Sequence, residues 1–149
     1  MSSLIAASTT RGLISLFKIN DAVDEICNEE SWTKESGQLV TDSTCNQISF
    51  SHVEKNLLGA ACDLSVSLYN VEVMKVDHHF TNMHKASVKS LTFSPVNRLL
   101  LCSASPDKSI CFYDMNDKVL VKKIRTDLPL SKVDFCADGF TVACSGQNA

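Results

Sequence analysis

The chain repeats itself with a spacing of about 43 residues. Three similar short strings contain the residues Phe50, Phe93 and Phe135, which are separated by 43 and 42 positions. Two further markers keep this spacing: Leu-Tyr-Asn at 68–70 returns as Phe-Tyr-Asp at 112–114, and Cys-Ser-Ala at 102–104 returns as Cys-Ser-Gly at 144–146. A unit of about 40–45 residues has room for four short strands and tight turns. The repeat therefore restricts the chain to an array of one small supersecondary unit.

The best copy of this unit, within residues 84–124, has the pattern of four strands. Its first strand alternates apolar and polar side chains, which indicates one buried face. Ser-Pro-Val-Asn at 94–97 is turn chemistry, and the apolar run that follows is typical of a strand buried on both faces. The four predicted strands are 88–93, 99–103, 110–113 and 118–124. We therefore predict an all-β fold in which four-stranded antiparallel sheets stack radially as blades of a β-propeller.

The strand pattern predicts about 13 strands, or about three blades, whereas a closed ring needs roughly four to eight. The predicted blade parts are residues 3–44, 45–82, 83–126 and 127–149. An acidic surface insertion is expected over about 20–44, with one helical turn at 22–28. Because both ends would leave strands unpaired, we expect an open propeller fragment that alone is poorly soluble or oligomeric. The remaining blades are then expected in a longer parent protein.

Composition argues against several classes of partner. The 149 residues carry 14 Lys and Arg against 17 Asp and Glu, a formal charge of −3 that gives no basic footprint for nucleic acid. No apolar run approaches the roughly 18 residues of a membrane span, and the N-terminus lacks the positive start of a signal peptide. The seven cysteines form no CxxC pair, which fits reduced thiols in the cytosol or nucleus, and we expect a cytoplasmic protein. Four of them lie in apolar runs and are predicted to be buried: Cys62, Cys102, Cys111 and Cys144.

The stretch HKASVKSLTFSPVNRLLLCSASPDKSICFYD, residues 84–114, resembles a WD repeat over its whole length. The resemblance implies a hydrogen-bonded set in which the loop residue His84, the strand residue Ser103, the turn residue Asp107 and the strand residue Tyr113 take part. Such a set makes physical sense because a buried carboxylate needs donors to stay charged. Tyr113 stands where the family keeps Trp, and Met83 stands where it prefers Gly. The other copies lack the full set.

Within the WD-repeat family, the chain most resembles the γ-tubulin ring complex recruiters of the NEDD type. The specific parts are HKA at 84–86, FSPVN at 93–97, and TDLPLSKVDF at 126–135 with a following Asp-Gly. The resemblance implies a non-catalytic scaffold for protein contacts at the centrosome and spindle, with γ-tubulin complexes or other spindle components as partners in microtubule nucleation. In that family a helical region after the propeller binds γ-tubulin, so the chain would belong to the targeting module. The alternative is a general WD-repeat adaptor, for example in a ubiquitin ligase or an RNA-processing complex.

No catalytic, metal or cofactor site is predicted from the residues. His78 and His79 are adjacent in a predicted strand, so their side chains point to opposite faces and cannot readily ligate one ion. No Gly-rich phosphate loop is present among the five glycines. His84 is expected to be a structural hydrogen-bond donor. The chain is therefore predicted not to be an enzyme.

Three surface features remain as candidates for contacts or modification. Ser94 precedes Pro95 and could be a proline-directed phosphorylation site, although turn formation explains the pair equally well. The basic residues of the fourth strand are expected to be solvated and to protect a sheet edge, or else to meet an acidic partner: Lys118, Lys122, Lys123 and Arg125. We also predict a partner-binding rim at the loops 83–87, 105–108 and 127–129, which bears Lys85, Lys108 and Asp127.

Overall fold

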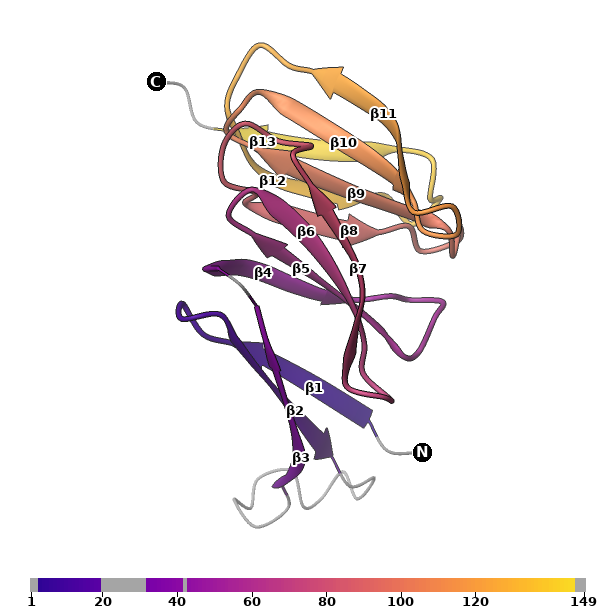
Figure 1. Cartoon of the computed structure of the whole chain (residues 1–149). Coiled ribbons are helices and arrows are strands. Elements are labelled where there is room, and N and C mark those ends of the chain that lie inside the picture. The colour runs from indigo at the N-terminus through magenta and orange to yellow at the C-terminus, as the bar shows by residue number, and fades with distance from the viewer. Residues whose placement is uncertain (1–2, 20–31, 42, 147–149) are drawn as a thin grey trace.

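The computed structural model of the chain describes residues 3–19, 32–41 and 43–146, and these residues form strands and no helix. The strands make up four antiparallel sheets, which we call blades 1 to 4 (Figure 1). Blade 1 contains β1 (Ser3–Ser8), β2 (Leu13–Ile19) and β3 (Trp32–Val40); blade 2 contains β4 (Cys45–Phe50), β5 (Leu57–Cys62), β6 (Ser65–Asn70) and β7 (Lys75–Thr81). Blade 3 contains β8 (Ser90–Phe93), β9 (Leu100–Ser105), β10 (Ser109–Asp114) and β11 (Val119–Arg125); blade 4 contains β12 (Leu130–Phe135) and β13 (Val142–Gly146).

Each blade is a meander in which every strand pairs with the next strand along the chain. The turns of blade 3 show why these residues produce such short strands. Lys108, between β9 and β10, has φ of 63°, and Lys118, before β11, has φ of 57°, so both turns reverse the chain tightly. The carboxylate of Asp114 accepts the amides of Asn116 and Asp117 at 2.7 and 3.0 Å, which ends β10 in a side-chain-capped turn.

The blades stack face to face, and an apolar core fills each of the three junctions between them. Between blades 1 and 2 the buried residues include Ile14, Leu16, Leu39, Leu58 and Tyr69. Between blades 2 and 3 they include Val66, Leu68, Phe80, Leu91, Phe93, Leu101 and Tyr113. Between blades 3 and 4 they are Cys102, Ala104, Ile110, Leu130 and Val133. Burial of each such Leu, Ile or Val side chain contributes about 1.5–3 kcal/mol. The cores therefore hold together sheets that share no backbone ladder.

Hydrogen bonds of polar side chains join the first strand of blade 2 to that of blade 3, and the first strand of blade 3 to that of blade 4. The bonded residues are separated in the chain by nearly the length of one repeat. Gln47 Nε2 on β4 donates to the carbonyl oxygen of Leu91 on β8 at 3.2 Å. Thr92 Oγ1 on β8 donates to the carboxylate of Asp134 on β12 at 3.1 Å. The amide of Val133 donates to Ser90 Oγ at 3.2 Å. The described blades thus form the partial, open β-propeller that the repeat predicts, with all-β structure throughout (Figure 1).

Two details of the sequence interpretation are wrong. The acidic insertion predicted over about 20–44 extends too far, because residues 32–40 form β3, which pairs antiparallel with β2 from Val40 opposite Leu13 to Trp32 opposite Ile19. The acidic part of the predicted insertion, at 20–31, lies outside the described residues. The ladder satisfies backbone groups that an irregular loop would leave to solvent. Cys144 is exposed rather than buried, because its strand packs in a two-stranded sheet among the described residues. The helical turn expected at 22–28 lies outside the described residues.

Candidate protein interface

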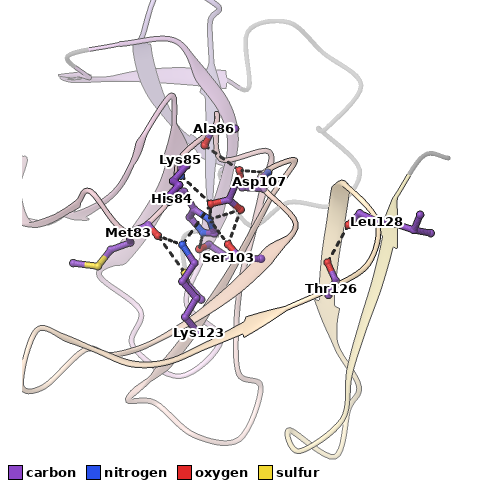
Figure 2. A network of polar contacts seen from close by, with 12 residues as sticks. Met83, His84, Lys85, Ala86, Ser103, Asp107, Lys123, Thr126 and Leu128 are labelled. Carbon is purple, nitrogen blue, oxygen red and sulfur yellow. Dashed lines mark hydrogen bonds and ion pairs between the residues drawn. The ribbon is translucent and has the colours of Figure 1, made fainter. Parts of the chain in front are cut away.

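One buried polar network, which we call the His84 network, joins three elements of blade 3 to the loop that enters it (Figure 2). His84 lies in the loop after β7 and is 4 % exposed. Its Nε2 is 2.8 Å from Ser103 Oγ on β9, and that hydroxyl is 2.9 Å from the hydroxyl of Tyr113 on β10. Its Nδ1 is 3.2 Å from both carboxylate oxygens of Asp107, in the turn between those strands. The structure therefore brings together the four residues named from the WD-repeat resemblance.

The protonation states follow from burial. Burial lowers the pKa of His84, and although the Asp107 carboxylate opposes this effect, the imidazole is neutral near pH 7. Nδ1–H then donates to Asp107, and Nε2 accepts the Ser103 hydroxyl, whose oxygen in turn accepts the hydroxyl of Tyr113. Burial raises the pKa of Tyr113, so its hydroxyl keeps the proton that this chain of donors needs.

Asp107 is the acceptor on which the network converges. Ser109 Oγ donates to it at 2.5 Å and the backbone amide of Lys85 at 2.8 Å. Burial opposes ionisation of this carboxyl, but the hydrogen bonds from Ser109, the Lys85 amide and His84 outweigh it and lower its pKa to about 2. The carboxylate is therefore ionised at neutral pH, and its donors tie the entering loop to the turn after β9.

Sequence reasoning missed two members of this arrangement. Ser109, at the start of β10, also lies 3.1 Å from His84 Nδ1, and it is 1 % exposed. Lys123 on β11 places Nζ 2.5 Å from the carbonyl oxygen of Met83 and 3.5 Å from Asp107 (Figure 2). The spacing of Ser109 two residues after Asp107 is a usable signal because short side chains in turns commonly bond within two or three residues. The Lys123 contacts have no such signal, since they join residues 40 and 16 positions apart in the chain.

The predicted partner rim lies directly over the His84 network. Lys85, Lys108 and Asp127 are all exposed. The amide of Lys85 is bound to Asp107, and the carbonyl oxygen of Lys108 accepts the amide of Thr126 at 2.9 Å. Thr126 Oγ1 bonds the carbonyl oxygen of Leu128 at 2.9 Å, which shapes the loop that carries Asp127 (Figure 2). The backbones of the three rim loops are therefore fixed, while their charged side chains remain in solvent.

The opposite rim offers a groove whose charges are already paired. The groove lies between blades 2 and 3 and is lined by residues that include Glu54, Asp77, Arg98 and Lys118. Arg98 lies 3.9 Å from Glu54, and Lys118 pairs with Asp77. Because these charges neutralise one another, the groove has less unpaired charge to offer a partner than the rim over the His84 network.

The other sequence candidates have structural positions. Ser94 is 1 % exposed, and its hydroxyl accepts the amide of Asn97 at 3.1 Å, so phosphorylation would require this turn to open. His79 bonds Ser67 Oγ at 2.8 Å, whereas His78 lies edge-on to Phe80 with ring centroids 4.6 Å apart. Among the described residues, no three His, Cys, Asp or Glu side chains are grouped to hold a metal ion. Within the same residues, no helix has the length and apolar character of a membrane span.

Comparison with known proteins agrees with this architecture. Residues 75–114 match the family model described as WD domain, G-beta repeat. The chain is 38 % identical over 104 residues to the protein named Protein NEDD1 of Homo sapiens, which is 69 % of the chain and 16 % of that relative; the figures for Protein NEDD1 of Bos taurus are the same. It is 42 % identical over 97 residues to Protein NEDD1 of Mus musculus, covering 64 % of the chain and 15 % of the relative.

The chain spans about a sixth of the length of the curated relatives it matches. The matched repeat covers β7 to β10 and includes His84, Ser103, Asp107 and Tyr113. WD40 repeats indicate a protein-interaction scaffold. Residues 75–114 thus match a WD repeat, and the stacked four-stranded blades and the similarity to Protein NEDD1 agree with a partial, open WD-repeat β-propeller.

Proposed function

We propose that the chain is part of the targeting propeller of a protein that recruits γ-tubulin complexes for microtubule nucleation at the centrosome and spindle. The observation that carries this proposal is the similarity to Protein NEDD1 from three mammals over about two thirds of the chain. The resemblance of residues 84–135 to recruiters of that type supports it further. Direct contact with γ-tubulin is not part of the proposal, because in that family a helical region after the propeller makes it.

The surface proposed for partner docking is the rim over the His84 network. Its support is geometric: loop backbones held by hydrogen bonds can present charged side chains without a large loss of conformational entropy on binding. Lys85 and Lys108 carry positive charge there, beside the carboxylate of Asp127. We propose that a centrosomal protein segment with an acidic patch docks on the two lysines. A partner of this kind gains association rate and orientation from charge complementarity more than affinity.

The test uses the full-length protein with a fluorescent tag in dividing cells. The rim variant combines Lys85→Glu with Lys108→Glu. The matched control is Lys55→Glu, a charge reversal at an exposed residue in the turn between β4 and β5, on the opposite rim. We expect the unaltered protein and the control to concentrate at centrosomes and to co-purify γ-tubulin complex proteins. We expect the centrosomal fluorescence of the rim variant to be at least about fivefold weaker than that of the unaltered protein, since like charges facing one another across an interface cost several kcal/mol.

Two results would contradict the proposal in different ways. Co-purification of ubiquitin ligase or RNA-processing subunits, with no γ-tubulin complex protein, would identify the chain as part of a general WD-repeat adaptor. Normal localisation of the rim variant would reject the rim while leaving the recruiting role intact. Because the altered side chains are exposed, we expect each variant to fold normally. Melting curves of the purified variants would verify this.

A further inference from the structure

Two cysteines of blade 2 lie directly opposite one another in adjacent strands. Cys45 is the first residue of β4 and Cys62 is the last residue of β5, and the two are partners in the register of that ladder. Directly opposed residues of antiparallel strands have Cα atoms about 4.5–5.5 Å apart. Disulfides form over Cα separations of about 4.4–6.8 Å. Both residues are free thiols in the structure, and their pairing in the ladder places them within this range.

The other buried pair of cysteines on neighbouring strands lacks this geometry. Cys102 on β9 lies opposite Phe112, and Cys111 on β10 lies opposite Ser103. The two thiols also belong to different cores, because Cys102 packs between blades 3 and 4 whereas Cys111 packs between blades 2 and 3. Their side chains therefore point to opposite faces of blade 3. This second pair serves as an internal control, because its cysteines lie on neighbouring strands but are not opposite each other in the ladder.

The surroundings make the two opposed thiols unequal. The hydrogen bond from Cys62, with a further contribution from Ser8, lowers the pKa of Cys45 to about 7. The same interaction raises the pKa of Cys62, which keeps its proton. Both cysteines are buried, and Cys45, at 6 % exposed against 1 % for Cys62, is the slightly more exposed of the two. A register shift between Cys45 and Gln47 makes the ladder irregular next to the pair.

We propose that Cys45 and Cys62 form a reversible oxidation site that closes to a cross-strand disulfide when the protein meets a peroxide. The Cys45 thiolate attacks one oxygen of hydrogen peroxide, which breaks the O–O bond, leaves a sulfenic acid and releases hydroxide. The Cys62 sulfur then attacks the Cys45 sulfur and displaces the second hydroxide. The Cys62 proton converts one hydroxide to water, and the proton that Cys45 released to solvent on ionising converts the other. In total, two thiols and one peroxide give one disulfide and two waters. A thiol reductant reverses the step.

The two thiols pack in the core between blades 1 and 2, whereas their chain neighbours contact the loop that enters blade 3. Asn46, next to Cys45, donates its side-chain amide to the carbonyl oxygen of Val88 at 2.9 Å. Asp63, next to Cys62, accepts the backbone amide of the same Val88 at 2.6 Å. Both neighbours of the cysteine pair therefore hold the loop that leads from His84 into β8. A covalent link between Cys45 and Cys62 would fix these two contacts relative to each other, so that oxidation stiffens the blade junction on the side that carries the proposed partner rim.

The test needs only the unaltered protein, because trypsin separates every cysteine concerned. Cleavage after lysine and arginine places Cys45 in residues 35–55 and Cys62 in 56–75, and it places Cys102 in 99–108 and Cys111 in 109–118. The folded protein is treated with hydrogen peroxide, remaining thiols are alkylated, and the digest is analysed by mass spectrometry without reduction. We expect peptides 35–55 and 56–75 joined by a disulfide, with 99–108 and 109–118 not joined to each other.

The rate provides a second criterion. Because the attacking group is a thiolate with a pKa near 7, we expect the linkage to form about tenfold faster at pH 8 than at pH 6. Dithiothreitol should separate the joined peptides. The proposal would be overturned if the joined pair were absent after the exposed Cys136 and Cys144 had been oxidised, or if it formed only in denaturant. A variant with serine at positions 27, 136 and 144 should still form the link, and failure in a folded sample of it would also count against the site.

Discussion

Removing the carboxylate of Asp107 should destabilise blade 3 more than any change at the exposed rim. In Asp107→Ala, the imidazole of His84, the amide of Lys85 and the hydroxyl of Ser109 lose their common acceptor. The side chain of Asp107 is only 5 % exposed, so water replaces it poorly. Breaking a buried charged network by removing one partner costs about 3–5 kcal/mol, and the partial access of the turn to solvent places the expected loss near about 3 kcal/mol. For a chain of this size, that corresponds to a melting temperature lower by about 6–12 °C.

Calorimetry of the unaltered protein, Asp107→Ala and the exposed control Asp127→Ala provides the assay. The folded carboxyl has a pKa of about 2, below its ordinary value of 3.8, so its stabilising contribution is present above about pH 4. The contribution is lost as the pH falls through about 2. The difference in melting temperature between the unaltered protein and Asp107→Ala should therefore become smaller between about pH 4 and pH 2. Equal melting temperatures for the Asp107 and Asp127 variants at pH 7 would refute the reasoning.

Three further predictions concern the network and the blade junction. Tyr113→Phe removes the hydroxyl that Ser103 Oγ contacts at 2.9 Å and should lower the free energy of unfolding by about 1–3 kcal/mol in urea titrations. An unchanged free energy of unfolding in Tyr113→Phe would show that the ring alone matters. Leu91→Ala empties a fully buried position between blades 2 and 3 and should cost about 2–5 kcal/mol by the same measurement. Gly59→Ala should lower the free energy of unfolding by about 1–3 kcal/mol, because a Cβ there would lie 3.0 Å from Leu91 Cδ1 and from two ring atoms of Phe93. Combining Gly59→Ala with Leu91→Val should recover part of this loss.

Much of the architecture could be predicted from the sequence because copies of the repeat unit show the same residue markers at nearly the same spacing. The phenylalanines 43 and 42 residues apart fall at the ends of the first strands of blades 2, 3 and 4, where β4, β8 and β12 finish. Alternation and turn residues then place the remaining strands, since period and turn chemistry are local properties. The position of β3 was not predicted, because apolar and polar side chains do not alternate regularly in its sequence, Trp-Thr-Lys-Glu-Ser-Gly-Gln-Leu-Val. Its place in the sheet depends instead on pairing with β2.

The site shows the same division between local and distant information. His84, Ser103, Asp107 and Tyr113 could be named from the WD-repeat pattern, and their hydrogen bonds fit the chemistry expected of a buried carboxylate. Lys123 could not, because its contacts join β11 to residues 40 and 16 positions away in the chain, which no local pattern predicts. Burial of Cys144 was predicted from an apolar run, but burial depends on what covers a strand, and that is a tertiary property. The opposition of Cys45 and Cys62 likewise appears only once the register of β4 and β5 is known.

The central claim is that repeated four-stranded sheets stack on one another through apolar junctions, and long-range NOEs between labelled methyl groups test it most directly. A sample with labelled Leu and Val methyls should show contacts from Val66 and Leu68 of blade 2 to Leu91 and Leu101 of blade 3, residues that share one buried core. Chemical shifts over residues 88–124 should be those of strands. Helical shifts in that segment, or the absence of every contact between these two pairs of residues in a folded sample, would contradict the account.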